Sequence, residues 1–356
     1  MLQPNQTYTL SRYVVLHADP DGLLVESPLS RDVLRVPNPA VLNLLLLLAR
    51  GARPADLYEG RPDAQQALLE RLLTKFESNG WLTAVDEEGE PEETHGALAD
   101  WAFHDLFFHS RSRAGRNVDR MGAKSGLKLE EMPPTFKEIE SSVRIALPSP
   151  DLDEVANRDL SFTEVLEARR SVREYADAPV SLDALGEFLY RSCRAKGYRD
   201  DSRVPLTRRP YPSGGSLYPL EVYVIPNRCE VLERGLYHYH PGRHDLNRLD
   251  AAPNHVETLL KDAQRAAGLD VLPPVLFCIS ARFRRTAWKY DSIAYALILK
   301  EAGALFQTMW LVATAMNLAP CGLGTGNSDV FAHAIGSEYY DETSVGEFVI
   351  GVRTMH

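Results

Sequence analysis

Cysteine is scarce in this chain, and its few copies are not arranged for a metal site or a disulfide framework. The 356 residues contain four cysteines, Cys193, Cys229, Cys278 and Cys321, all far apart in sequence. The chain has no CxxC pair and no zinc-ribbon spacing, which argues against a structural zinc site. Few and scattered cysteines are typical of a reducing compartment, so we expect a cytoplasmic protein.

The sequence also lacks a secretion signal, a long hydrophobic run and an excess of positive charge. Residues 1–13 contain no basic segment followed by an apolar one. The most apolar run, 40–49, is far shorter than the roughly 20 residues that a spanning helix needs. A longer apolar stretch, 292–320, is interrupted by Lys300 and Glu301 and is predicted to be a buried core helix. The net charge of −10 disfavours binding to nucleic acid or to an anionic membrane.

The N-terminal part of the chain predicts a small domain of strands followed by helices. Residues 8–36 alternate as strands do, with a turn signal at 19–22. Two helical patterns follow at 39–51 and 65–80, and then a short strand at 81–82. This order is typical of a winged-helix-like domain over residues 1–90. The second helix carries acidic residues beside its few basic ones, so peptide binding is favoured over DNA binding.

The rest of the chain predicts a connector and then an enzyme domain of the α+β class. Residues 91–157 form a linker and an aromatic and basic connector, and 158–356 form the enzyme domain. A capping box at Ser161–Glu164 opens one helix, and Ser181 caps the next. The later elements are predicted to be strands at 220–226, 235–239, 275–281 and 347–352, a helix at 292–317 and a glycine-rich turn at 321–326.

Two segments of this domain have residues suited to a phosphorylated planar ligand. Arg169, Arg170, Ser171 and Arg173 combine three guanidinium groups and a hydroxyl, which suit a phosphate and a polyhydroxyl chain. A solvated basic helix end explains them equally well. The loop 211–219 contains adjacent glycines, which let a backbone approach a flat ring closely. Taken alone, this loop could also be a tight turn.

Three other patterns could indicate cofactor or metal binding. The glycine turn 322–326 is expected to follow a helix, whereas a Rossmann fingerprint follows a strand, so dinucleotide binding is excluded. Gln307 is expected to be either a buried amide facing a cofactor or a core residue. His238, His240 and His244 could supply metal ligands from one strand face, but no carboxylate-rich cluster accompanies them, so no metal is expected.

Lys289 and Tyr290 are the candidate acid–base pair. A lysine acts as a base near neutral pH when burial or nearby cations lower its pKa. Arg282, Arg284 and Arg285 precede it closely and could have that effect. A surface lysine beside an interfacial tyrosine is the alternative.

Taken in order, these motifs resemble the nitroreductase superfamily over residues 161–353. The resemblance is carried by RRSVREY, PSGGSLYPLE, the helix with Gln307, GLGTG and the terminal GVR. Within that superfamily the chain resembles the SagB-type dehydrogenases, also called azoline oxidases. The segments that carry this closer resemblance are GLYHYHP, WKYDSIAY and the upstream ADWAFHDLFFHSRSRAGR.

The resemblance implies FMN as cofactor, a homodimer, and oxidation of thiazolines or oxazolines to thiazoles or oxazoles in a ribosomally made precursor peptide. Oxygen would be the electron acceptor, and cyclodehydratase proteins would be partners that install the azolines. Lys289 is then the base and Tyr290 positions or shares the proton. The implied FMN residues are Arg169, Arg170, Ser171 and Arg173 for the phosphate and ribityl chain, Pro212, Ser213, Gly214 and Gly215 against the ring, and Gln307, Gly322, Gly324 and Arg353 as further contacts. CGLGTG departs from the GSCWIG-like segment often found in the family.

Two other functions remain open from the sequence. One is an NAD(P)H-dependent nitroreductase or quinone reductase, in which the Lys-Tyr pair would be incidental. The other is a non-catalytic scaffold that binds peptides. In an azoline oxidase or in such a scaffold, the strands at 8–36 could bind a leader peptide, which would add a strand to a sheet edge.

Overall fold

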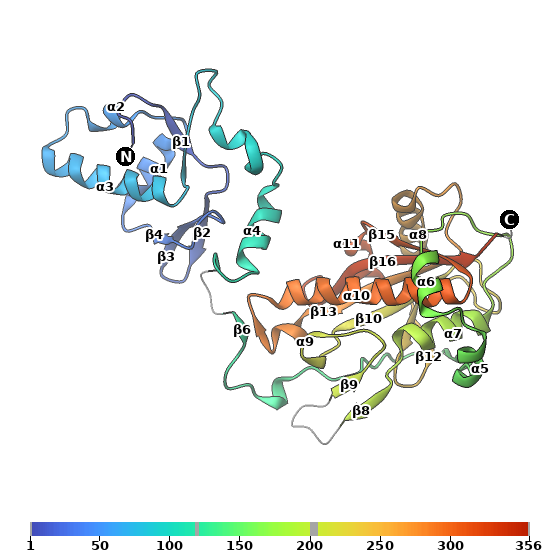
Figure 1. The fold of residues 1–356 in the computed structure, drawn as a ribbon. Coiled ribbons are helices and arrows are strands. Elements are labelled where there is room, and N and C mark those ends of the chain that lie inside the picture. Colours follow the sequence, from blue (N-terminus) through green and yellow to red (C-terminus); the bar gives the residue numbers. More distant parts are fainter. Residues whose placement is uncertain (1, 118–120, 200–205, 355–356) are drawn as a thin grey trace. The chain divides into compact units, whose positions relative to one another are not determined.

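The computed structural model describes residues 2–117, 121–199 and 206–354. The chain divides into two compact units (Figure 1). One comprises Met1–Gly122 with Asp291–Ile293, and the other comprises Ala123–Tyr290 with Ala294–His356.

The first unit contains the strands and helices expected from its sequence. Asp19 pairs with Gly22 across the predicted turn, so β2 and β3 form the expected hairpin, and β4 adds to β3. A separate pair joins β1 to β5. The elements are β1 (Tyr8–Leu10), β2 (Val15–Asp19), β3 (Gly22–Glu26), β4 (Val33–Arg35), α1 (Pro39–Leu48), α2 (Pro54–Tyr58), α3 (Asp63–Ser78), β5 (Leu82–Ala84), α4 (Phe103–Arg111) and two short 3₁₀ turns, Glu92–Thr94 and Gly96–Leu98.

The core of this unit forms where α1 and α3 bury one face each. Asn38 caps α1 by accepting hydrogen bonds from the backbone N–H groups of Ala40 and Val41. Phe76 of α3 and Trp81 are fully buried, with ring centroids 5.4 Å apart. Leu68 is 59% exposed, so the apolar stripe of α3 is wider than the face it buries. The comparison with a winged helix stays a prediction.

The second unit is built on a seven-stranded sheet with the order β15-β16-β13-β10-β11-β12-β7. Every pairing in this sheet is antiparallel. Helices are interspersed with these strands, so the α+β expectation is confirmed. The elements are β7 (Arg144–Ala146), α5 (Leu152–Arg158), α6 (Phe162–Ala168), α7 (Leu182–Cys193), β8 (Gly197–Arg199), β9 (Leu206–Arg208), β10 (Leu220–Pro226), β11 (Tyr237–His240), β12 (Asp245–Arg248), α8 (Pro253–Ala267), β13 (Val275–Arg282), α9 (Phe283–Ala287), α10 (Ala294–Ala315), β15 (Leu318–Leu323), α11 (Ser328–Ile335) and β16 (Glu342–Val352), with 3₁₀ turns at Leu129–Glu131 and Gly214–Ser216; the short strands β6 (Gly122–Ala123) and β14 (Tyr290–Asp291) lie at the boundary between the units.

Both faces of this sheet are covered by helices, which explains why the central strand β10 is buried along its whole length. Val222 and Val224 of β10 pack in the same cluster as residues of α7 and α10. Tyr223 and Ile225, which alternate with them, pack with α8 and α11. Successive side chains of a strand point to opposite faces, so β10 contributes to both cores. α10 is the one helix of the described chain that is long and apolar enough to cross a membrane, and it packs here along a sheet.

The structure corrects the expected context of the glycine turn. Leu318–Leu323 is a strand, β15, so the turn follows a strand and precedes the helix α11. Our reason for excluding a Rossmann fingerprint was therefore wrong. The exclusion now rests on topology, because β15 pairs antiparallel with β16, whereas a Rossmann unit needs parallel strands.

Candidate active site

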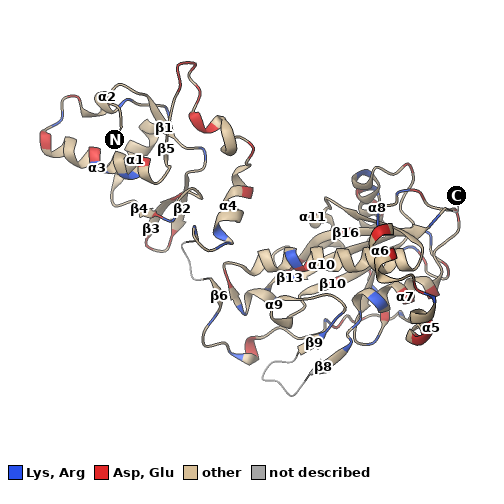
Figure 2. Cartoon of the chain, in the orientation of Figure 1, with Lys and Arg blue, Asp and Glu red and all other residues tan. Residues whose placement is uncertain are grey.

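The helix α10 contacts two groups of predicted site residues. The first group is the glycine loop with Lys289 and Tyr290, and the second is the arginine segment 169–173. The helix carries only two charged residues, Lys300 and Glu301, so most of it is tan in Figure 2. Its first turns lie against the Ser213–Gly215 loop, because a Cβ added to Gly214 would meet Leu297 at 3.3 Å. Trp310, nine residues beyond Glu301, lies beside the arginine segment. Nine residues of helix span roughly 14 Å.

The first group brings the glycine loop together with the candidate acid–base pair. A Cβ added to Gly215 would lie 2.7 Å from the Nζ of Lys289 and 2.7 Å from the Oη of Tyr290. Gly215 also has a φ of +64°, so a side chain there would be strained and would displace the Lys289 amine. The structure thus places two segments 74 residues apart in direct proximity.

Lys289 is held by its backbone and remains partly exposed through its side chain. Its carbonyl accepts a 2.8 Å hydrogen bond from the N–H of Lys124, and its own N–H donates to Thr286 at 3.1 Å. The Nζ lies 5.5 Å from the ring centroid of Tyr290. A fixed backbone with a reachable amine is the arrangement that a positioned base requires.

The second group gathers where the segment 169–176 runs beside β15 and β16. α6 ends at Ala168, so Arg169–Arg173 is an extended segment and not a helix end. Val172 donates to the carbonyl of Pro320 at 2.8 Å, and Ala176 donates to that of Val352 at 2.9 Å. The bridge between Tyr175 and Arg353 adds the last predicted arginine to this group.

The side chains of this second group are available to a ligand. Arg170 and Arg173 are exposed, while Arg169 and Ser171 are partly exposed. The guanidinium of Arg169 lies 5.6 Å from the ring centroid of Trp310. Gly322 of β15 packs against the same indole, because a Cβ there would meet Trp310 at 2.8 Å.

Three predicted residues lie outside the contacts of both groups. Gln307 is exposed on α10, so neither of its expected environments, a cofactor-facing buried site or the core, is what the structure shows. Gly324 lies exposed in the turn after β15. Pro212 is exposed at the start of the glycine loop.

Sequence reasoning missed a buried charge cluster beneath the glycine loop. Arg209, Arg285 and Glu301 are all buried, and they surround the backbone of residues 213–220. Arg285 donates to the carbonyl of Leu217, and also to that of Pro133 at 2.6 Å. Burial and the neighbouring Arg282 and Arg209 lower the pKa of Arg285 to about 9. One feature of the sequence could have indicated this cluster, namely Glu301 as the single acidic residue of the apolar helix α10.

This cluster supports a backbone with unusual dihedral angles. Gly215, Ser216 and Tyr218 have φ values of +64°, +56° and +48°. Two of these are not glycine, and such residues cost about 1 kcal/mol or more unless neighbouring contacts enforce them. Arg209 contributes with its N–H, which donates to the Oη of Tyr218 at 3.2 Å, and with its guanidinium, 5.3 Å from the Tyr218 ring centroid.

The histidines of the HxHxxxH pattern are bound to protein groups. His238 lies 3.0 Å from Glu221, and both side chains are fully buried. His240 faces Glu138 at 3.2 Å, and His244 faces the Oη of Tyr239 at 2.9 Å. Among the described residues, no group of three His, Cys, Asp or Glu side chains could hold a metal.

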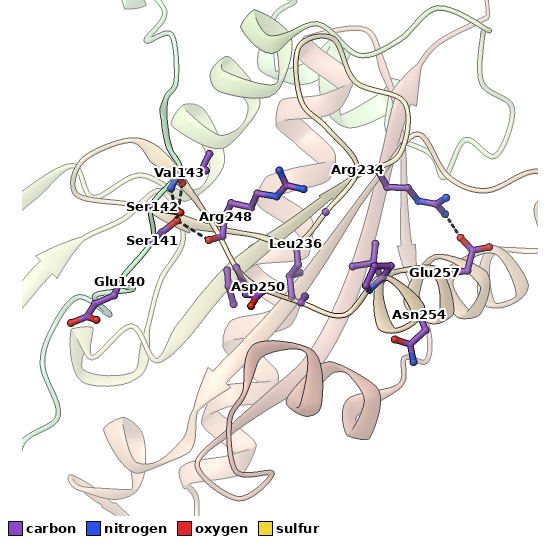
Figure 3. A pocket seen from close by; sticks show the side chains of 15 residues that line it. Glu140, Ser141, Ser142, Val143, Arg234, Leu236, Arg248, Asp250, Asn254 and Glu257 are labelled. Carbon is purple, nitrogen blue, oxygen red and sulfur yellow. Dashed lines mark hydrogen bonds and ion pairs between the residues drawn. The ribbon is translucent and has the colours of Figure 1, made fainter.

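One pocket of the second unit is lined by none of these residues. It has a volume of about 910 Å³ and is lined by segments around 140–143, 234–236 and 248–257 (Figure 3). Its two arginines are already engaged, since Arg234 pairs with Glu257 at 2.5 Å and Arg248 with Glu233 at 2.7 Å. No predicted site residue lines it, so we do not assign the chemistry to it.

The residues of the two groups fit the parts of FMN. Exposed guanidinium groups suit a phosphate, and Gly214–Gly215 leaves a backbone surface without side chains beside the Lys289 amine. A buried indole Nε1–H of Trp310 has no hydrogen-bond partner in the described chain. The two groups lie at different points along α10, as the ring, ribityl chain and phosphate of an extended FMN molecule would require.

Comparison with known proteins agrees with this geometry. The nitroreductase family profile matches residues 166–352, and the profile of the cyanobactin oxidase ThcOx matches residues 8–118. A nitroreductase-like protein of Methanocaldococcus jannaschii, MJ1384, is 32% identical over 176 residues, covering 49% of this chain and 81% of that protein.

Two peptide-processing proteins are also similar to part of the chain. The microcin B17-processing protein McbC of Escherichia coli is 31% identical over 118 residues, covering 31% of this chain and 42% of McbC. The trifolitoxin-processing protein TfxB of Rhizobium leguminosarum is 29% identical over 120 residues, covering 31% of each chain. The family resemblance seen in the sequence is therefore confirmed: this chain belongs to the nitroreductase family of oxidoreductases.

Proposed function

We propose that this chain is an FMN-dependent azoline oxidase that converts thiazolines or oxazolines in a ribosomally made precursor peptide to thiazoles or oxazoles. The observation that carries the proposal is the meeting of Lys289 and Tyr290 with the glycine loop at Gly215. The ThcOx-like N-terminal region and the similarity to McbC and TfxB support a peptide substrate.

The chain's own groups divide the work between binding and proton transfer. Arg169, Arg170, Ser171 and Arg173 would bind the phosphate and ribityl chain, and Arg353 would join them. Residues 212–215 would lie against the ring, with Gln307, Gly322 and Gly324 as further contacts. FMN, when bound, supplies the two-electron acceptor, and oxygen is the proposed final acceptor.

Lys289 would accept the proton that leaves the azoline ring. Its Nζ and the Oη of Tyr290 both lie beside Gly215 at the edge of the glycine loop, so both groups would face the same part of the bound ring. The backbone bonds to Lys124 and Thr286 fix the main chain from which the amine extends. Loss of one proton and one hydride converts an azoline to an azole.

Replacing Lys289 tests the proposal directly. We expect Lys289→Ala to retain FMN, seen in the visible spectrum, and to lose azole formation by at least about 100-fold, as expected for a missing general base. Mass spectrometry of an azoline peptide measures the loss of two hydrogens. Lys300→Ala, at an exposed lysine of α10, is the matched control. Normal turnover by Lys289→Ala would remove Lys289 from the mechanism, and rapid NAD(P)H oxidation with nitroaromatics would favour a reductase instead.

We also propose that the first unit binds the leader part of the peptide. β2 is an edge strand of the sheet β2-β3-β4, so a peptide strand could add to it. Removing residues 1–90 should then weaken processing of leader-bearing peptides and spare short azoline peptides without a leader. Equal loss with both substrates would contradict this role.

The remaining partners follow from the same proposal. A homodimer is supported by apolar side chains exposed on and near α6, namely Leu160, Phe162 and Leu166. Cyclodehydratase proteins would supply the azoline, because an azoline must exist before it is oxidised. We propose a cytoplasmic location for this pathway.

A further inference from the structure

The backbone around Lys289 lies between two short elements and depends on a second segment for its hydrogen bonds. The helix α9 ends at Ala287, and Lys289 follows two residues later, just before the strand β14. The N–H of Lys289 still donates to the helix, at the carbonyl of Thr286. The last carbonyls of a helix, in contrast, have no partner within it and need a donor from elsewhere.

Lys124 supplies that donor and a second one two residues further on. Its Nζ donates to the carbonyl of Ala287 at 2.6 Å, and its backbone N–H donates to the carbonyl of Lys289 at 2.8 Å. A hydrogen bond from an ammonium group is stronger than one between neutral groups. One residue thus holds the main chain on both sides of Trp288, so Lys289 cannot shift without breaking or straining these bonds.

Trp288 adds a third hydrogen bond between the same two segments. Its indole Nε1–H donates to the carbonyl of Lys128 at 3.0 Å, and the residue is only 8% exposed. A hollow of about 400 Å³, lined by residues of both segments, lies between 124–131 and 284–288. Because this space is not filled by apolar packing, the three hydrogen bonds carry much of the contact between the segments.

We propose that Lys124 is a positioning residue for the proton transfer: its ammonium and its backbone N–H together fix where the Lys289 amine stands beside Gly215. Without the ammonium, the carbonyl of Ala287 loses its charged donor, and the main chain before Lys289 is held at one point fewer. The amine of Lys289 would then leave the place beside Gly215 for part of the time. This inference rests on the proposed function, in which Lys289 is the base.

Steady-state kinetics of the FMN-loaded protein test the inference. Lys124→Met keeps the aliphatic stem and removes the donor, and we expect kcat for azole formation to fall about 10- to 100-fold, because a small misplacement of a reacting group has an effect of that size. FMN affinity and the KM for the azoline peptide should not change. Lys124→Arg restores a cationic donor and should recover most of kcat. Lys128→Met is the matched control, because its amine pairs with Glu131 at 3.1 Å and its carbonyl, which binds Trp288, is retained.

Hydrogen exchange of the apoprotein is a second readout that needs neither FMN nor turnover. The N–H of Lys289 should exchange faster in Lys124→Met and at the wild-type rate in Lys128→Met, with the amides of β10 as the internal reference. An unchanged kcat in Lys124→Met overturns the inference, and so does an equal loss of kcat in Lys128→Met or a loss that weaker FMN binding explains. If the wild type forms no azole but this N–H exchanges faster in Lys124→Met alone, the proposed function fails and the positioning of Lys289 by Lys124 stands.

Discussion

The two arginine clusters of the second unit contrast in burial and in contacts. Arg169, Arg170 and Arg173 are exposed or partly exposed on an extended segment beside β15. Arg209 and Arg285 are buried under the glycine loop and donate to backbone carbonyls. The same type of side chain is thus exposed at one end of α10, where we propose that it binds a ligand, and is buried against backbone carbonyls at the other.

This contrast suggests that different arginines would bind the phosphate and support the conformation of the glycine loop. An exposed guanidinium keeps its donors free for phosphate oxygens, and its loss should leave the fold intact. The buried guanidinium of Arg285 uses two of its nitrogens on the carbonyls of Leu217 and Pro133, while its Nη2 has no partner in the described chain. Its loss should change the loop and the stability of the protein before it changes any ligand contact.

The largest expected effect is on the buried side of this comparison. Arg285→Ala should lower the free energy of unfolding by about 4 kcal/mol, because it leaves two carbonyls without donors and opens a cavity. Arg284→Ala, at the exposed neighbour in α9, should change it by less than about 0.5 kcal/mol. Denaturant unfolding of the two variants measures both values. Equal stabilities would mean that Arg285 does not support the loop.

The contrast also explains what the sequence could predict. Arg169–Arg173 was recognised because three arginines within five residues form a local pattern, and PSGG because adjacent glycines are unusual before a strand. Arg209, Arg285 and Glu301 are far apart in sequence, and only the packing of β9, α9 and α10 brings them together. The capping box at Ser161, the cap at Ser181, the β2–β3 hairpin and the central strands were predicted because they depend on neighbouring residues. The strand β15 was missed because its LAPCGL sequence contains proline and glycine, which usually break strands.

The second, slightly smaller effect is the pH dependence of the free energy of unfolding that we expect from Glu301. The pKa of Glu301 is raised from its ordinary 4.5 to about 7, so the folded state binds its proton more tightly than the unfolded state does. The stability from this proton is fully present below the unfolded pKa and is lost as the pH rises through 7. Between about pH 4 and about pH 8, the wild type should therefore lose about 3 kcal/mol of stability relative to Glu301→Gln. Parallel stability curves for the two proteins would show that Glu301 does not titrate on folding.

The smallest effect should come from the exposed cluster and should concern the ligand alone. Arg170→Ala removes a guanidinium that the structure leaves exposed beside Ser171. A charge-assisted hydrogen bond contributes about 2 kcal/mol, so FMN affinity should fall about tenfold or more while the stability of the apoprotein stays unchanged. Riboflavin, which lacks the phosphate, should bind both proteins equally, and Arg113→Ala in the first unit controls for net charge. If riboflavin binding fell as much as FMN binding, Arg170 would act on the ring or the loop, and the division between an exposed recognition cluster and a buried supporting cluster would break down.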